Sequence, residues 1–347
     1  MAKEKKTERT EADIFKGKDI LVTGGCGSIG IEIVRQLLKH DPLRIRVFDH
    51  DEAGHFRINQ EIKSDKIRNL IGSITDKDRI SRAMQGVDIV FHAAALKHVP
   101  FCEYNPFEAV HTNVIGTQNV VDAAIGNGVK IFVGISTDKA VNPINTMGAT
   151  KLLSEKIITN APSGFSTCKF CCVRFGNVLN SVGSVIPIFK KQIADGGPVT
   201  VTSDKMTRFF MSMDEAVSLV LKTAEITRGG ETFILKMNAL KVMDLAQVMI
   251  EELAPRYNHD PKKIKIDIIG VRPGEKIDEG LMTKEEADYM VDTKDMLVLY
   301  NSILCNYGKG IIPAGRKQAN HLEYNSGNIP LLSKEDIRKK LYEKKII

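Results

Sequence analysis

The chain has 347 residues, 43% hydrophobic and 27% charged, so it is long enough for a large core and has a globular composition. Its net charge of +6 is modest and few aromatics lie among the basic residues, which disfavours nucleic-acid binding. No apolar run is long enough to cross a bilayer, and the charged stretch 3–18 has no signal-peptide core, so we expect no membrane span. The six cysteines lack a metal-ligand spacing, so we expect reduced thiols, a cytoplasmic location and no metal site.

The first half of the chain alternates between apolar strands and helices. Residues 1–17 are expected to form a flexible N-terminal lead. Strands are predicted at 19–23, 45–48, near Leu70, and at 88–92, 131–135 and 169–174. Helices are predicted at 28–39, 51–63, 77–84, 105–127 and 147–159. This alternation predicts an α/β fold, a Rossmann-like doubly wound parallel sheet, over residues 18–175.

The second half has a different rhythm. Glycines, prolines and short segments mix from 176 to 208, and helices are predicted at 213–227 and 242–253. We expect residues 176–347 to form mainly a smaller substrate-binding lobe, from which the chain also returns to the first domain. The polar, turn-rich stretch 306–330 is expected to have no regular structure.

A glycine-rich turn follows the first strand. Gly24, Gly27 and Gly30 leave room for a pyrophosphate to approach the backbone, and the helix that begins there stabilises its charge. Asp49, at the end of the second strand, is placed to accept hydrogen bonds from an adenosine ribose, and it would repel a 2′-phosphate. NAD is therefore favoured over NADP, although Asp51 could take this role. An ordinary glycine turn beside a surface Asp is the alternative, and the order of elements argues against it.

The segments 73–76 and 93–95 follow the third and fourth strands. They would let a flat ring or a diphosphate approach, but tight helix–sheet packing explains them equally well. The expected cofactor-binding residues up to this point are Gly24, Gly27, Ser28, Ile29, Gly30, Asp49, Ser73, Ile74, Ala93 and Ala94.

Several motifs resemble a known family. The segments 23–30 and 92–95, with Lys151 four residues after Met147, resemble the extended short-chain dehydrogenase/reductases. The segments that narrow this resemblance to the UDP-N-acetylglucosamine 4,6-dehydratases of bacterial and archaeal surface-sugar synthesis are 95–100, 112–117, 136–143, 174–178, 206–210 and 272–276. The similarity runs from about Phe15 to Leu332. The superfamily usually has Tyr where this chain has Met147, which points to the branch that retains the configuration at carbon 5.

The resemblance implies a reaction and a catalytic site made of Thr137, Asp138, Lys139, Met147 and Lys151. Carbon 4 of the sugar is oxidised, so that the hydrogen on carbon 5 becomes removable and water can leave from carbons 5 and 6. Thr137 would bond the carbon-4 hydroxyl, Asp138 would be the acid at carbon 6 and Lys139 the base at carbon 5. Lys151, one helical turn from Met147, would hold the nicotinamide ribose. An Asp–Lys pair suits this task if burial moves both pKa values toward neutrality; a surface ion pair is the alternative.

Substrate-binding residues are implied in the same way. Asn177, Arg208 and Arg272 would lie near the diphosphate and Glu275 near a ribose hydroxyl. Lys97 and His98 would face the sugar, and ordinary surface charge is the alternative for the arginines.

Three other functions and one assembly stay open at this point. The functions are an inverting dehydratase that also epimerises carbon 5, another nucleotide-sugar epimerase or reductase, and a non-catalytic dinucleotide-sensing scaffold. A homo-oligomer, a dimer or higher, is expected through the helical stretches 105–127 and 147–159.

Overall fold

A nine-stranded sheet forms the centre of the computed structural model, which describes residues 13–161, 167–179, 181, 183–306 and 323–347. The strand order is β14-β15-β10-β6-β5-β4-β1-β2-β3, and the seven strands from β10 to β3 pair in parallel. The parallel strands are β1 (Asp19–Thr23), β2 (Arg44–Asp49), β3 (Ile67–Ile71), β4 (Ile89–His92), β5 (Ile131–Thr137), β6 (Lys169–Phe175) and β10 (Thr232–Leu235). The antiparallel edge strands are β14 (Met290–Asp292) and β15 (Met296–Leu299). The predicted doubly wound parallel sheet is confirmed.

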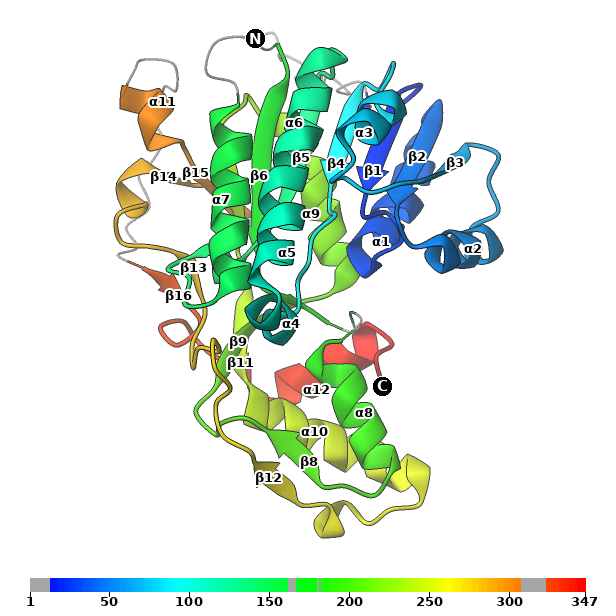
Figure 1. The fold of residues 1–347 in the computed structure, drawn as a ribbon. Coiled ribbons are helices and arrows are strands. Elements are labelled where there is room, and N and C mark those ends of the chain that lie inside the picture. The colour runs from blue at the N-terminus through cyan, green and yellow to red at the C-terminus, as the bar shows by residue number, and fades with distance from the viewer. Residues whose placement is uncertain (1–12, 162–166, 180, 182, 307–322) are drawn as a thin grey trace, which may run out of the picture.

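Helices cover both faces of this sheet (Figure 1). The helices α3 (Lys77–Ala83), α6 (Thr117–Gly126) and α7 (Thr146–Asn160) lie side by side on one face. On the other face α1 (Ser28–Leu37) packs against α9 (Met213–Ile226), and α2 (Glu52–Glu61) contributes to the same core. The strands β1, β4 and β10 are buried along their whole length because helices cover both faces of the sheet, whereas the edge strand β3 is partly exposed.

The predicted helix 105–127 is interrupted by a π-helical turn, η2 (His111–Gly116), between α5 (Pro106–Val110) and α6; a short helix, α4 (Val99–Tyr104), precedes it. Asn113 in this turn accepts a hydrogen bond from the Leu96 backbone N–H and donates one to the Leu96 carbonyl. The turn therefore fixes the loop after β4, and a π-helical turn of this kind often marks a functional site.

Below the sheet in Figure 1 lies a smaller lobe with its own hydrophobic core. Its helices are α8 (Val185–Ala194), α10 (Val242–Leu253) and α12 (Lys334–Glu343), and its strands are β7 (Asn177–Val178), β8 (Val199–Val201), β9 (Thr207–Met211), β11 (Asn238–Lys241) and β12 (Ile266–Ile268). The sequence periodicity did not predict α8 or α12. The strands β10, β14 and β15 come from the same half of the chain but belong to the large sheet.

Two further strands and several short helices complete the described part. They are β13 (Gly280–Met282), β16 (Tyr324–Asn325), α11 (Ser302–Asn306), η1 (Leu38–His40), η3 (Asp138–Ala140), η4 (Ala254–Tyr257), η5 (Pro261–Lys263) and η6 (Ala287–Tyr289). The expected irregular stretch 306–330 thus contains one strand, while residues 307–322 lie outside the described residues.

The expected flexible lead is wrong for its last residues. Phe15 is fully buried in the main core, with its ring 5.1 Å from that of His40 and 6.2 Å from that of Phe91. A single aromatic residue in a charged stretch gave no periodic signal, so sequence reasoning placed the boundary too late. Residues 1–12 lie outside the described residues.

Candidate active site

The expected catalytic site begins where β5 ends. Thr137 is the last residue of β5, and Asp138 and Lys139 open the short helix η3 that leads to α7. The side chain of Asp138 is only 1% exposed and that of Lys139 22%. The alternative of a surface ion pair is therefore wrong, because the pair is enclosed by the fold.

Three side chains converge on the ammonium of Lys139. Its Nζ lies 2.9 Å from Asp138 Oδ1, 3.4 Å from Asn177 Oδ1 and 3.7 Å from Glu279 Oε1. The Thr137 hydroxyl donates to the same Asp138 Oδ1, at 2.8 Å. Three of the expected residues, Thr137, Asp138 and Lys139, are thus in direct contact, and Asn177 approaches them from the smaller lobe.

Sequence reasoning missed Glu279. It lies just before β13, a strand that packs beside η3, and it is 2% exposed. The segment 272–276 was part of the family resemblance, so the acidic residue three positions after Lys276 was the available signal. Glu279 Oε2 and Asp138 Oδ2 are both buried, and neither has a hydrogen-bond partner among the described residues. Two unsatisfied carboxylate oxygens beside one ammonium suit a site that polar substrate groups complete.

The ionisation of this cluster differs from our expectation. Burial favours the neutral form of Lys139, but the neighbouring Asp138 and Glu279 carboxylates outweigh it and raise the pKa of Lys139 above 10.5. Burial also raises the pKa of Glu279 above 4.5, although Lys139 opposes this change. Without substrate, Lys139 is therefore an ammonium, and Glu279 is the carboxylate made readier to accept a proton.

Helix α7 carries the other two expected catalytic residues. Lys151 Nζ donates to the carbonyl of Ile135 in β5, at 2.6 Å, and burial lowers the pKa of Lys151. Met147 is 3% exposed and packs with Cys102 and Ala109 of α4 and α5. Met147 is therefore a packing residue in this structure, and its thioether carries no proton to transfer.

A buried charge network fixes the end of β5 against α7. Arg174 of β6 is fully buried and pairs with Glu155 of α7 and with Glu286, and it donates to the Leu281 carbonyl of β13. Glu155 also accepts from the Ser136 hydroxyl, at 2.7 Å. The residue before Thr137 is thus held by a network that reaches α7, β6 and β13, and this positions the reactive cluster.

The glycine turn has the geometry that a pyrophosphate requires. A Cβ on Gly24 would lie 2.5 Å from the Ala94 backbone nitrogen, and one on Gly30 would lie 2.3 Å from the Gly24 carbonyl oxygen. Helix α1 begins after Gly27 with no side-chain cap and no acidic residue in its first turn, so its N-terminal N–H groups can bind an anion. Asp49 Oδ2 accepts from the backbone N–H of the turn residue Cys26, at 3.0 Å. These residues fit a dinucleotide.

The other expected cofactor residues also have packing roles. Ile74 is buried and contacts the place where a Cβ on Gly116 would lie, and the Ala93–Ala94 backbone contacts Gly24. The Ser73 hydroxyl is 2.7 Å from that of Thr75. The contact of Ala93 and Ala94 with Gly24 holds the end of β4 close to the glycine turn, whereas Ile74 packs against η2.

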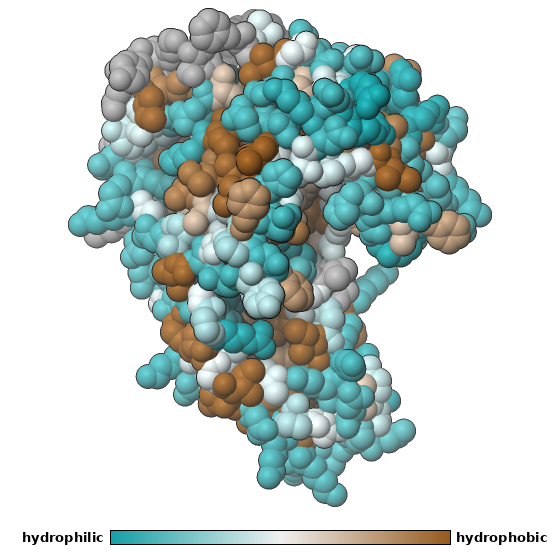
Figure 2. All heavy atoms as spheres, viewed as in Figure 1, coloured by the Kyte–Doolittle hydropathy of each residue, from teal (hydrophilic) through white to brown (hydrophobic). Residues whose placement is uncertain are grey.

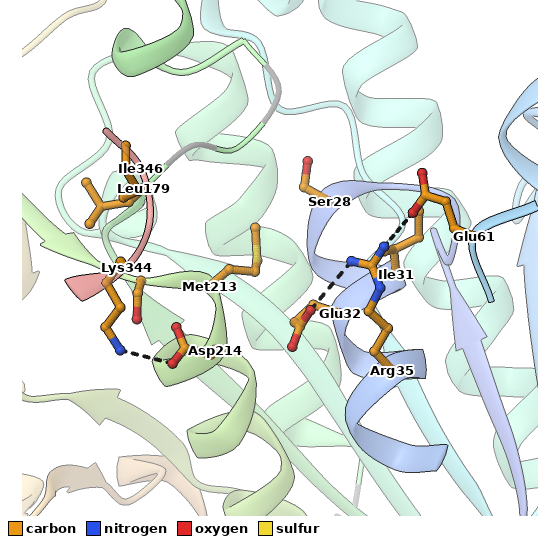
Figure 3. A pocket seen from close by; sticks show the side chains of 11 residues that line it. Ser28, Ile31, Glu32, Arg35, Glu61, Leu179, Met213, Asp214, Lys344 and Ile346 are labelled. Carbon is orange, nitrogen blue, oxygen red and sulfur yellow. Dashed lines mark hydrogen bonds and ion pairs between the residues drawn. The ribbon is translucent and has the colours of Figure 1, made fainter. Parts of the chain in front are cut away.

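A pocket of about 330 Å³ borders the glycine turn between α1, α9 and the C-terminal residues (Figure 3). Arg35, held by two glutamates, forms part of one wall, and the ion pair of Lys344 with Asp214, at 3.0 Å, forms part of the other. Ser28 lines the pocket where α1 begins. Its lining residues include none of the cluster around Lys139.

The residues expected at the substrate diphosphate differ in their roles. Arg208 is 5% exposed and donates hydrogen bonds to the carbonyls of Thr207, Lys276 and Ile277. These bonds fix the backbone of the segment before β13. The Arg208 guanidinium also lies 3.6 Å from Glu275 Oε1, and the expected contact between Arg208 and a diphosphate stays a prediction. Arg272 is exposed, and its backbone N–H donates to the Glu275 carboxylate.

Lys97 and His98 lie in the loop that Asn113 fixes. Burial lowers the pKa of Lys97, and His98 forms the N-terminal boundary of α4 with its ring 5.9 Å from that of Phe101. His98 also lies against Gly183 of the smaller lobe, where a Cβ would be 2.6 Å from the ring. This loop therefore contacts both parts of the molecule.

A family model described as "Polysaccharide biosynthesis protein" matches residues 20–301. The chain belongs to this family. The family relative named "UDP-N-acetylglucosamine 4,6-dehydratase (inverting)" from Campylobacter jejuni is 42% identical over 294 residues, which are 84% of this chain and 85% of that protein. The expected resemblance to the 4,6-dehydratases is confirmed at the level of the family.

Two further comparisons extend over nearly the whole chain. A Methanocaldococcus jannaschii protein named an uncharacterized membrane protein is 54% identical over 96% of this chain and 97% of its own length. The X-ray structure of Pen from Bacillus thuringiensis has a TM-score of 0.89, 43% identity, and coverage of 96% of this chain and 99% of that one. In the part of our chain that the structure describes, no helix combines the length and apolar character needed to cross a membrane.

Proposed function

We propose that this chain is an NAD-dependent 4,6-dehydratase that converts UDP-N-acetylglucosamine to the 4-keto-6-deoxy sugar, for synthesis of a surface polysaccharide. The observation that carries the proposal is the enclosed cluster of Thr137, Asp138, Lys139 and Glu279 at the end of β5. It supplies a hydroxyl, two carboxylates and an amine in mutual contact, and dehydration next to a ketone requires both an acid and a base. The name of the Campylobacter relative supports the same reaction.

The cofactor would lie between the glycine turn and α7. Gly24, Gly27 and Gly30 would face its pyrophosphate, Asp49 a ribose, and Lys151 the nicotinamide ribose. When bound, NAD supplies the acceptor for the carbon-4 hydride and returns that hydride to carbon 6.

Thr137 and Asp138 would handle the first proton. The Thr137 hydroxyl already donates to Asp138 Oδ1 at 2.8 Å, so it can accept from the carbon-4 hydroxyl while its own proton passes to Asp138. Asp138 then carries the proton that the carbon-6 hydroxyl needs in order to leave as water. One carboxylate thus acts first as a base through Thr137 and afterwards as the acid at carbon 6.

Lys139 would be the base at carbon 5. Its pKa is raised by Asp138 and Glu279 against the effect of burial, so protonation of Asp138 removes one of the two charges that keep Lys139 an ammonium. The first proton transfer therefore prepares the second. Once its ammonium has lost a proton, the neutral Lys139 amine takes the carbon-5 hydrogen and can give it back on the same face, which retains the configuration.

Retention at carbon 5 is the finer part of the proposal. Met147 replaces the phenol that could deliver a proton from another direction, and its side chain is packed into a hydrophobic cluster. The Campylobacter relatives carry the word "inverting" in their names, so the stereochemical outcome needs a direct measurement. Among the remaining expected residues, Lys97, His98, Asn177, Arg272 and Glu275 stay our candidates for substrate contacts.

Incubation with UDP-N-acetylglucosamine in deuterated water tests this function. We expect a 4-keto-6-deoxy product with deuterium at carbon 5 in the original configuration. An inverted carbon 5 would contradict the retaining assignment alone. An epimerised sugar that has kept its oxygen at carbon 6 would favour the activity in the name of a 38% identical Rickettsia relative, a UDP-glucose 4-epimerase. Unchanged substrate with tightly bound NAD would favour the scaffold.

A homo-oligomer is also part of the proposal. Large apolar side chains are exposed on α4 to α7, and Figure 2 shows brown side chains gathered over these front helices. The large side chains exposed on these helices include Phe101 (70% exposed), Tyr104 (88%), Phe107 (71%), Ile115 (42%) and Leu153 (51%). A patch of this kind marks an interface. Light scattering on the protein and on its Phe107→Glu variant measures the oligomeric state, and a monomeric wild type would refute the proposed homo-oligomer.

We place the protein in the cytoplasm, where its six free thiols would remain reduced.

A further inference from the structure

Glu279 lies in the catalytic cluster, although the steps above give its side chain no part in moving protons. Its carboxyl group is 3% exposed, and Oε1 lies 3.7 Å from Lys139 Nζ. Oε2 is buried and has no hydrogen-bond partner within the described part of the chain. A buried carboxylate is costly unless it is paired, so its retention here indicates a task.

The backbone of Glu279 is held on both sides. Its N–H donates to the Ser326 hydroxyl and its carbonyl accepts from the Ser326 N–H, each at 2.9 Å. Ser326 is fully buried, and its hydroxyl is 2.6 Å from that of Thr207. A residue from near the C-terminal end thus fixes the position of Glu279 beside η3.

The charged groups that face Glu279 are Lys139, Asp138, Arg208 and Lys276. Arg208 donates to three backbone carbonyls, and Lys276 Nζ donates to another at 2.7 Å. Lys139 instead points its ammonium between the Asp138 and Glu279 carboxylates. Lys139 is therefore the cation with which the Glu279 carboxylate pairs.

A lysine base must be neutral when it acts, whereas the free protein holds Lys139 as an ammonium. We propose, building on the function above, that Glu279 is a positioning residue for Lys139, which orients the ammonium and accepts one proton from it. The N–H bond at Nζ breaks and leaves its electron pair on nitrogen, while an O–H bond forms at Oε1. An amine and a carboxylic acid replace the ion pair, and the proton returns to Nζ after turnover.

The direction of the ionisation agrees with this geometry. Burial raises the pKa of Glu279, which makes the carboxylic acid less costly there than in water. Once Asp138 has taken the first proton, Lys139 holds its own proton less strongly, as argued above. The pair of Lys139 and Glu279 therefore holds one proton before the carbon-5 hydrogen is removed, two protons once Lys139 has taken it, and one again when Lys139 returns it to carbon 5.

The pH dependence of kcat/KM tests the proposal. In wild type the proton stays inside the pair, so kcat/KM is level across the neutral range. In Glu279→Gln the proton must leave to solvent, so kcat/KM is reduced and rises about tenfold per pH unit over the same range. Glu279→Asp keeps a carboxylate and restores the level profile at a lower rate. Glu285→Gln, an exposed residue of the next turn, serves as the matched control and keeps the wild-type profile.

A second measurement is independent of turnover. The Nζ titration of Lys139, followed by NMR and assigned with Lys139→Met, should shift to lower pH in Glu279→Gln, because one of two neighbouring carboxylates is removed. An unshifted titration, or a Glu279→Gln profile parallel to that of wild type, overturns the proposal. A shifted titration in a protein that forms no 4-keto sugar instead refutes the proposed function and leaves the coupling between the two residues established.

Discussion

Removal of Arg174 is the most direct test of how the site is held in place. Its guanidinium makes two hydrogen bonds to Glu155, two to Glu286 and one to the Leu281 carbonyl, and the side chain is fully buried. Arg174→Met leaves the carboxylate of Glu155, 2% exposed, without its counter-charge, and that of Glu286 likewise. Breaking a buried pair costs about 3–5 kcal/mol because an uncompensated charge remains buried.

Urea denaturation measures this loss as the change in unfolding free energy. The chain offers a matched control in Arg35, which also pairs with two glutamates but has a side chain 43% exposed. Arg35→Met should cost at most about 1 kcal/mol, since exposed pairs are screened by solvent. Equal losses in the two variants would refute the reasoning, and so would a loss below about 1 kcal/mol for Arg174→Met.

Three more outcomes are expected. Lys139→Met should abolish turnover and still bind NAD, as measured by isothermal titration; near-normal turnover would remove Lys139 as the base. Gly30→Ala should lose NAD binding, because its Cβ would lie 2.3 Å from the Gly24 carbonyl oxygen, and binding within about tenfold of wild type would contradict this geometry. Burial opposes ionisation of Glu286, but Arg174 lowers its pKa below 4.5, so this carboxylate stabilises the fold above pH 4.5 and the unfolding free energy should fall as the pH drops below it. A Glu286→Gln variant should lose part of that dependence.

The sequence predicted the features of the fold and of the site that depend on residues close together along the chain. The order of strand, glycine turn, helix and Asp49 is local, and the fold it predicted is present with element boundaries shifted by a few residues. The triplet Thr137, Asp138 and Lys139 was found for the same reason, because the end of a strand is readable from its apolar run. The family resemblance then gave these residues roles that composition alone could not.

Non-local contacts account for the failures. Glu279 reaches Lys139 because Ser326 and β16 hold the segment before β13, and no spacing along the chain encodes that arrangement. Arg208 was assigned to a diphosphate through the family resemblance, and that role stays a prediction; its hydrogen bonds to three backbone carbonyls depend on contacts that no spacing along the chain encodes. The π-helical turn at Asn113 was not predicted, and the hydrogen bonds of Asn113 to the Leu96 backbone link it to a segment 17 residues earlier in the chain.

Two buried charge clusters lie close together at the end of β5. They differ in whether their carboxylate oxygens have hydrogen-bond partners, and this difference distinguishes a structural cluster from one suited to catalysis. In the cluster around Arg174 each carboxylate is paired, and Glu155 binds Ser136 as well. In the cluster around Lys139, one oxygen of Asp138 and one of Glu279 have no partner in the described structure. Unsatisfied buried oxygens cost about 1–3 kcal/mol each, so a cluster built only for stability would resemble the first. The cluster around Lys139 keeps these unsatisfied oxygens, and the cluster around Arg174 fixes the adjacent end of β5. This arrangement is expected of a site where substrate hydroxyl groups and transferred protons complete the hydrogen bonds.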